Sequence, residues 1–499
     1  MTTPDAPSPG AAPDATAERR LHPMSWLFVL VQQLKQFVLP LVALLVFGRG
    51  DRNELWPLIG VAVLVVLSLW QYFTYRYGVA GDRLVVRSGL FERSLRVIPF
   101  ARIHNVALQQ SALHRVFGVA EVRLESAGGS KPEAQMRVLK LEDALALEAL
   151  VRHRGATAME SSSEPESTTL LALPFGEIVR LGLVSNRGLV VVAAAFAAIV
   201  QISQRAVMDT FRSVGKWLFG FAGEHHFGLT QYVVSALALV LFAILVLRGF
   251  SILLALLQYH GFRLSEIGRR LTVERGLLAR WRTSASRRRI QAWTLTEGTL
   301  HRLLKRRSLD VDTAVAEEHQ QQRALRELAP IATPAHCDAL IEHLLPRAGW
   351  TQLDWRELPA SNWWRLVLPT IPVVIAITIA ASWRFGAWGL LALAWLPSAA
   401  FAAHRRARRM AYAANAEIVA VREGWWTRHW RFAELDKLQA LQLTRSPLDR
   451  RCGTATLHLD TSGAGALSPP LRMRFLPHED ALALYASLSR TLARRPLRW

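Results

Sequence analysis

Six cationic side chains recur at matched positions along the chain, and cations so placed could bind anionic groups. With Gly89, Gly276 and Gly424 as anchors, one cation stands 13 residues on and a second stands 26 residues on in each case. Arginine can make bidentate contacts to phosphate that lysine cannot. We therefore interpret this set as a candidate lipid- or partner-binding surface: Arg102, Arg115, Arg289, Arg302, Lys437 and Arg450.

Patterns typical of catalysis, cofactors or metals are scarce. The adjacent histidines of Glu224-His225-His226 would not share a helix face, and no third ligand stands nearby. Asp310 and Asp312 alternate on a predicted strand, and we expect both to face solvent. No dinucleotide, P-loop, nucleophile-elbow or zincin motif is present. The sequence predicts a protein that is not an enzyme and has no cofactor or metal.

The two cysteines give no sign of a disulfide framework. Cys337 and Cys452 lie far apart and neither belongs to a CxxC or Cys/His spacing. We interpret both as buried thiols in a reducing compartment.

Apolar runs dominate the composition, which is 51% hydrophobic. A membrane-spanning helix needs about 20 apolar residues, and Trp at many run ends is typical of an interfacial belt. Six runs in three pairs meet or approach that length: 26–47 with 56–70, 188–202 with 232–257, and 363–383 with 385–403. The sequence therefore predicts six transmembrane helices in three hairpins.

Positive charge indicates both the orientation and the partner. Most Lys and Arg lie between the hairpins, including His404–Arg409, which favours an inner (plasma) membrane protein with several spans and both termini in the cytoplasm. The net charge of +21 calls for an anionic partner. Anionic membrane lipids are favoured over nucleic acid, because no aromatic stacking platform or nucleic-acid-binding motif accompanies the cations.

Two cations interrupt the apolar runs. Lys35 and Arg248 are intramembrane polar candidates, and each either has a functional role or extends its side chain to the cytoplasmic interface. Residues 26–36 either span the membrane or lie flat on it. The segment 205–226 is predicted to be an amphipathic helix on the outer face.

The cations belong to a unit that occurs three times. Alternating residues flank Gly89, which predicts a β-hairpin. Further strands follow, and each unit ends in a helix with the tripeptide Asp-Ala-Leu, at Asp143, Asp338 and Asp480. The unit is therefore predicted to be an antiparallel β domain closed by a C-terminal helix.

A transmembrane hairpin followed by such a domain, with G-L/W, [RK]-[IL]-x and L-x-R in that order, resembles the bacterial membrane-flanked proteins of the YdbT/YdbS type. That resemblance implies pleckstrin-homology-like (PH-like) domains in a membrane setting and supplies no substrate. The first unit fits best. The second lacks the Gly pair after Thr313, and the third has GWWTRHW in place of the usual aliphatic start.

The fold class we expect is an α+β membrane protein with six transmembrane helices in three hairpins, each followed by a cytoplasmic PH-like domain. The expected boundaries are 1–22 (disordered tail), 26–73 (hairpin 1), 74–155 (PH-like domain 1), 156–172 (linker), 173–258 (hairpin 2 with its outer connection), 259–346 (PH-like domain 2), 347–362 (linker), 363–405 (hairpin 3) and 406–490 (PH-like domain 3).

The leading functional interpretation is a scaffold or binding protein at the anionic leaflet, with a role in envelope stress or antimicrobial resistance. Anionic lipids are the expected partners, with protein partners or a homo-oligomer as further ones. Two alternatives stay open. One is a transporter or lipid-handling protein whose path includes Lys35 and Arg248. The other is a protein-interaction platform without lipid specificity.

Overall fold

The computed structural model describes residues 73–88, 94–100, 103–126, 134–155, 168–202, 229–313, 326–462 and 468–494, with scattered positions in 19–70 and 205–220. The chain divides into two compact units. Unit 1 comprises Met1–Glu166, Ser185–Gly261 and Glu274–Ser284, and unit 2 comprises Ser167–Val184, Phe262–Val273 and Ala285–Trp499. Repeats 1, 2 and 3 below denote the strands β2–β7, β9–β14 and β16–β21, each with the helix that closes it.

The first sheet of unit 1 is antiparallel in the order β1-β2-β3-β4. Its strands are β1 (Arg19–Arg20), β2 (Arg76–Ala80), β3 (Arg83–Ser88) and β4 (Ser94–Pro99). Leu84 and Ile98 point into the core, as the alternation around Gly89 predicts. Two residues of the segment expected to be a disordered tail therefore form β1, and β4 is the end strand of this sheet.

A second group of antiparallel strands in unit 1 runs in the order β7-β6-β5-β11. These are β7 (Ala134–Lys140), β6 (Val119–Ser126), β5 (Ile103–Gln110) and β11 (Arg280–Ser286). Helix α3 (Ala112–Val116) connects β5 to β6, and α4 (Leu141–Gly155) packs on the three strands of repeat 1. Since β11 comes from repeat 2, one repeat completes the sheet of the repeat before it.

Unit 1 also contains two apolar helices, α6 (Arg187–Ile202) and α8 (Leu229–Tyr259). Leucine and valine side chains are exposed on all sides of α8. A helix surrounded by lipid tails can present such a surface, because its backbone polar groups are satisfied internally. The two helices meet at Gly188, where a Cβ atom would lie 2.2 Å from the Ser251 hydroxyl oxygen.

The large sheet of unit 2 has the strand order β14-β13-β12-β18-β17-β16-β15. From repeat 2 come β14 (Glu327–Ala332), β13 (Arg307–Thr313) and β12 (Ile290–Glu297). From repeat 3 come β18 (Arg428–Glu434), β17 (Ile418–Glu423) and β16 (Ala411–Ala414), and the preceding linker adds β15 (Arg356–Glu357). Trp293 stacks on Phe432 where β12 meets β18.

A three-stranded sheet, in the order β19-β20-β21, completes repeat 3. It is formed by β19 (Leu438–Thr444), β20 (Thr454–Thr461) and β21 (Arg472–Pro477), with α15 (Pro447–Cys452) after β19 and α16 (His478–Arg494) as the closing helix. Strand β19 is an end strand of this sheet. Its counterparts β5 and β12 are both paired with a strand of the following repeat.

The remaining elements of repeat 2 connect and close its strands. They are β8 (Thr168–Ala172), which pairs with β9 (Arg263–Ile267), then β10 (Arg270–Arg275), the 3-10 turn η2 (Arg287–Arg289), α9 (Thr299–Leu303) and the closing helix α11 (Pro334–Leu344). Strands β8 and β15 both lie within segments expected to be linkers. Each short linker strand therefore extends the sheet of its own repeat before the chain enters an apolar hairpin.

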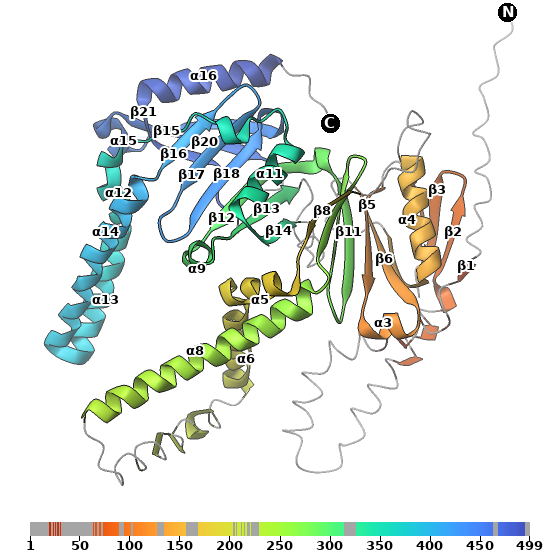
Figure 1. Ribbon diagram of the computed structural model, residues 1–499, viewed down its shortest axis with the longest axis horizontal. Coiled ribbons are helices and arrows are strands. Elements are labelled where there is room, and N and C mark those ends of the chain that lie inside the picture. Colours follow the sequence, from red (N-terminus) through yellow and green to blue (C-terminus); the bar gives the residue numbers. More distant parts are fainter. Residues whose placement is uncertain are drawn as a thin grey trace, which may run out of the picture. The chain divides into compact units, whose positions relative to one another are not determined.

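The third apolar hairpin projects from unit 2 (Figure 1). It consists of α12 (Trp363–Val367), α13 (Thr370–Phe385), η5 (Gly386–Ala394) and α14 (Trp395–Ala407). The chain reverses at Gly386, whose φ is 60°. From there η5 runs back along α13, and α14 packs against α12.

The prediction of six spans is only partly met. Among the described residues, Thr230–Tyr259 and Ala360–Ala407 are long and apolar enough to cross a membrane, and a third span counts if α5 (Phe175–Val184) and α6 act together. Because the chain reverses at Gly386, Ala360–Ala407 is not one straight span, and neither α13 nor α6, with 16 residues each, reaches by itself the roughly 20 residues that a span needs. Hairpin 1 and the segment 205–226 lie almost wholly outside the described residues.

Candidate anion-binding site at the repeat junctions

Two repeat junctions share one register. In junction 1, the pairing of β5 with β11, Arg280 lies opposite Gln110 and Thr283 opposite Ala107. In junction 2, the pairing of β12 with β18, Arg428 lies opposite Glu297 and Arg431 opposite Thr294. With Gly276 and Gly424 as anchors, these pairs occupy the same positions in the repeat. The junction is therefore a repeated structure.

A glycine turn precedes each covering strand. Gly276 has a φ of 112° and Gly424 a φ of 94°, which side-chain-bearing residues rarely adopt. A Cβ atom would lie 1.9 Å from the Ala279 carbonyl oxygen in the first turn and 2.0 Å from that of Thr427 in the second. The anchors of the sequence repeat are thus glycines that the turn requires.

Each turn lies at the end of an apolar helix. In unit 1 the Gly276 amide donates to the His260 carbonyl and the Leu277 amide to the Leu257 carbonyl, each at 2.9 Å. In unit 2 the Trp425 ring contacts the Phe401 ring of α14, with centroids 5.3 Å apart. The junctions are consequently held next to the places where the chain leaves its apolar segments.

Two of the predicted cations hold these turns. The Arg115 guanidinium donates to the Leu277 carbonyl at 2.9 Å, and the Arg302 guanidinium donates to the Trp426 carbonyl at 3.0 Å. The second cation of repeats 1 and 2 therefore binds the backbone of the following repeat. Sequence reasoning predicted the residues but not this contact.

The other predicted cations lie on separate elements. Arg289 belongs to η2 and is half-buried, Lys437 lies 3.3 Å from Asp436 in the 3-10 turn η6 (Leu435–Lys437), and Arg450 is exposed on α15. Arg102 lies outside the described residues, as does Lys35. Within unit 2 the described members of the set therefore lie on four different elements.

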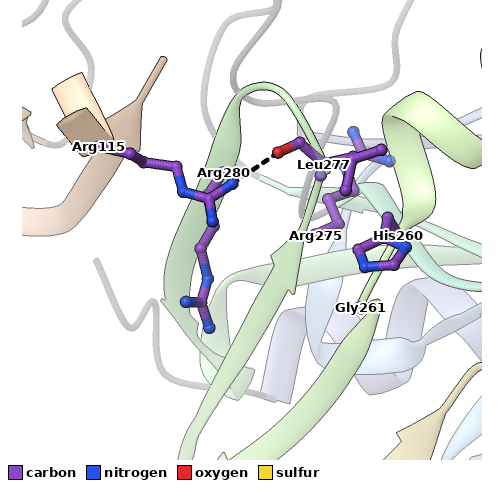
Figure 2. A pocket seen from close by; sticks show the side chains of 7 residues that line it. Arg115, His260, Gly261, Arg275, Leu277 and Arg280 are labelled. Atoms are coloured by element: carbon purple, nitrogen blue, oxygen red, sulfur yellow. Dashed lines mark hydrogen bonds between the residues drawn. The ribbon is translucent and has the colours of Figure 1, made fainter. Parts of the chain in front are cut away.

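A cavity of about 280 Å³ opens at junction 1 (Figure 2). Figure 2 shows Arg115 reaching the Leu277 carbonyl from α3, with the other cationic side chains around it. The described residues that line the cavity include three arginines, one histidine and no carboxylate: Arg115, His260, Gly261, Arg275, Gly276, Leu277 and Arg280. Such a lining suits a phosphate group, which accepts several charge-assisted hydrogen bonds.

Arg275 and Arg280 differ in how they are held. Arg275 is buried, and its guanidinium lies over the Tyr259 ring at 5.0 Å from the centroid. Arg280 is largely exposed and lies 3.2 Å from Glu274, so its charge is only partly compensated. The set of cations predicted from the sequence lacks Arg275, Arg280 and His260. Arg275 could have been included, because it directly precedes the repeat glycine Gly276.

Junction 2 carries acidic residues at two matching positions. Glu423 stands where repeat 2 has Arg275, and Glu297 stands where repeat 1 has Gln110. Burial alone would raise the pKa of Glu423, but the His429 hydrogen bond at 2.9 Å and the Arg406 charge outweigh it and hold this pKa at about 2. Arg428 lies 3.5 Å from Glu297. Much of the positive charge at junction 2 is therefore compensated.

A buried ion pair reinforces junction 2. Arg431 donates to Asp312 at 2.6 Å and to the Thr294 hydroxyl at 2.8 Å, and both charged residues are buried. The prediction that Asp312 faces solvent is thus wrong, because Arg431 of the next repeat covers it. A strand pattern alone does not reveal which neighbour covers a strand face.

Excess positive charge nevertheless remains where α14 ends. Burial and the nearby charges of Arg428 and Arg422 lower the pKa of Arg409, which follows α14. The Arg405 guanidinium lies over the Phe401 ring at 5.3 Å from the centroid. Cations beside aromatic rings at the end of an apolar helix are typical of a membrane interface.

Apolar side chains surround these cations. The short helices that carry Arg115 and Arg302 expose Val116 at 78% and Leu303 at 77%. Leu278 and Trp426, in the two turns, are exposed as well. Basic and exposed apolar groups together fit the boundary between lipid headgroups and acyl chains.

The structure also shows the surroundings of Arg248 and of the two cysteines. Arg248 donates to the Ser185 carbonyl at 3.2 Å and to the Asn186 side chain at 3.3 Å, between α5 and α6. Cys337 is buried, which raises its pKa to about 12, whereas Cys452 is exposed, so its interpretation as a buried thiol is wrong. Among the described residues no group of three His, Cys, Asp or Glu side chains could hold a metal.

Comparison with known proteins places the chain in a family. Residues 28–155, 217–345 and 366–492 match the Bacterial PH domain family. The chain is 20% identical over 489 residues to the UPF0699 transmembrane protein YdbT of Bacillus subtilis (strain 168), an alignment that covers 93% of this chain and 96% of that protein. No solved structure matches. The chain therefore belongs to the Bacterial PH domain family, as a YdbT-type membrane protein that carries the domain three times.

Proposed function

We propose that the chain is an integral membrane binding protein whose PH-like repeats rest on the anionic leaflet, and that the cavity at junction 1 receives a phosphate-bearing headgroup. The observation that best supports this proposal is the lining of the cavity, whose described residues include three arginines and a histidine but no carboxylate. The cavity lies at the end of α8. Near an anionic leaflet each Lys or Arg contributes about 1 kcal/mol of attraction.

The location of the cavity supports lipid over a soluble anion. Its turn is hydrogen-bonded to the last residues of α8, and α3 beside it exposes Val116. A headgroup held there would leave its acyl chains next to an apolar helix. The aromatic and cationic groups at the end of α14 would support the same orientation in unit 2.

Several arginines of repeat 2 already form ion pairs within the chain, which leaves fewer of them to bind an anion. Arg287, Arg306 and Arg307 of repeat 2 each form an ion pair, with Glu266, Glu177 and Asp338 respectively. Such pairs reduce the field that a basic sequence would otherwise project. The lipid-facing charge is thus expected from the cavity at junction 1 rather than from the most basic segment of the sequence.

The finer topology belongs to the same proposal. Six spans, an inner-membrane location and cytoplasmic termini agree with the positive residues between the hairpins. A scaffold role in envelope stress or antimicrobial resistance would follow from headgroup recognition at this surface. A transport path has less support, because Thr230–Tyr259 and Ala360–Ala407 contain no carboxylate.

The test uses the full chain in lipid nanodiscs. Binding of a short-chain phosphatidylglycerol and of the matching phosphatidylcholine is measured for the original chain, for Arg115→Gln with Arg280→Gln, and for Arg356→Gln as a control. Arg356 is as exposed as Arg280 but lies on β15. We expect a preference for phosphatidylglycerol that only the double variant loses.

Two results would decide against the proposal. Equal affinity for both lipids at low salt would exclude recognition of the anionic headgroup. Equal losses in the double variant and in Arg356→Gln would indicate a diffuse effect of net charge without a site. Inorganic phosphate, added as a competitor, separates headgroup chemistry from insertion of the acyl chains.

A further inference from the structure

The chain has two sheet ends that match each other. Strand β5 is covered by β11 and strand β12 by β18, so repeats 1 and 2 each pair with a strand of the following repeat. In repeat 3 the corresponding strand β19 ends its sheet among the described residues. In repeat 1 the strand β4, the counterpart of β11 and β18, likewise ends its sheet among the described residues.

Side chains of β4 are more exposed than their counterparts on β11 and β18, which lie at the junctions. Val97 corresponds to Ser284 and Phe432, which are both buried at the junctions. In β4, Val97 is 45% exposed and Leu95 is 58% exposed. A β-strand that presents valine and leucine at a sheet end is a template for pairing.

Burial along β19 shows the same difference. Gln442 is exposed, whereas its counterparts Ala107 and Thr294 are buried. Leu443 is only partly buried, whereas its counterparts Leu108 and Leu295 are buried. On both end strands, therefore, some side chains are more exposed than their counterparts at the junctions.

We infer that β19 of one chain pairs with β4 of a second copy, so that the third repeat of one chain receives the first repeat of the next. The partner is a second copy because this chain already forms the same strand pairing twice, in one register. Strand addition of this type gains affinity from main-chain hydrogen bonds and selectivity from side-chain pairs.

The register specifies the pairs. Transferred to the end strands, it places Ser94 opposite Thr444, Leu95 opposite Leu443, Arg96 opposite Gln442 and Val97 opposite Leu441. Two of these pairs are aliphatic, and cross-strand aliphatic pairs stabilise a sheet. The exposed Arg450 corresponds to Arg115 and Arg302, the cations that bind the turn of the following repeat.

The interface is heterologous, because it joins different surfaces of two identical chains. Such contacts close into a ring or extend as a linear array, depending on the rotation between copies. The proposal does not depend on lipid recognition, and its test does not use lipid binding.

Cysteine crosslinking in native membranes tests the pairing, in a Cys452→Ser background that keeps the buried Cys337. One population carries Arg96→Cys and the other Gln442→Cys. After coexpression and mild oxidation we expect a covalent dimer, and neither variant alone should give one. The positive control places Ala107→Cys and Thr283→Cys in one chain, at the matching pair of junction 1, where an internal disulfide should form.

A second measurement removes dependence on cysteine geometry. Val97→Lys places a charge on the proposed interface, and Val79→Lys is the matched control, because Val79 is 43% exposed on β2 of the same sheet. We expect Val97→Lys to lose most of the crosslinked dimer and Val79→Lys to keep it. The absence of any mixed dimer while the control disulfide closes, or equal losses in both lysine variants, would overturn the inference.

Discussion

Junctions 1 and 2 have the same backbone and the opposite electrostatic design. Both use a glycine turn, one strand register and one arginine that binds the turn of the following repeat. Junction 1 has Gln110 and Arg275 where junction 2 has Glu297 and Glu423. Two substitutions between repeats therefore separate a cavity lined by cations from a junction closed by ion pairs. The backbone sets the position of the site, and these side chains decide whether an anion can enter.

The largest effect is expected at the buried pair of junction 2. Arg431→Ala removes the nearest cation from the buried Asp312 and leaves only Arg326, 4.0 Å away, which should cost about 3 kcal/mol of unfolding free energy. Thr283→Ala, at the matching position of junction 1, should cost about 1 kcal/mol. Thermal unfolding in detergent measures both. The double variant Arg431→Met with Asp312→Leu should recover most of the loss, and no recovery would indicate that packing, not charge, holds junction 2.

An intermediate effect is expected when junction 1 is given the acid of junction 2. Gln110→Glu places a carboxylate opposite Arg280 and should weaken binding of phosphatidylglycerol about tenfold, or about 1.4 kcal/mol. Glu297→Gln should act in the opposite sense and raise the anion affinity of junction 2. Nanodisc binding measures both variants. Unchanged affinity in both would mean that these paired positions do not set the electrostatic difference.

The smallest effect is expected from mild acid. The pKa of Glu423 is held at about 2, below its ordinary value of 4.5, so its stabilising effect is complete above pH 4.5 and declines as the pH falls toward 2. At pH 4 the loss should be less than about 1 kcal/mol. The protection factors of amide hydrogen exchange in β17 and β18, corrected for the intrinsic pH dependence of exchange, should fall between pH 6 and 4 in the original chain and not in Glu423→Gln. The same pH response in both would assign the acid sensitivity to another group.

The repeated unit could be predicted from the sequence, but the strand pairing between repeats could not. Gly276 and Gly424 could be predicted as turn residues, because positive φ favours glycine locally. The end position of β4 and the covering of Asp312 could not, since alternation shows that a face is buried but not by which strand. Arg115 and Arg302 were singled out from their spacing as candidate lipid- or partner-binding residues, but the spacing did not reveal that they donate to backbone carbonyls of the following repeat. Comparing the repeats position by position, with attention to charge reversals such as Arg275 and Glu423, would have indicated the cavity.

Because a strand of one repeat completes the sheet of the repeat before it, the first of these sheets can be completed only late in synthesis. Strand β5 is complete at Gln110, but the strand that covers it begins only at Arg280, after both helices of the second apolar hairpin have been made. While that hairpin enters the bilayer, β5 therefore lacks the strand that pairs with it in the folded chain. Long-range pairings of this type fold late and leave intermediates prone to aggregation. A ribosome-bound chain that stops before β11 should consequently depend on chaperones, whereas one that has passed Ser286 should not.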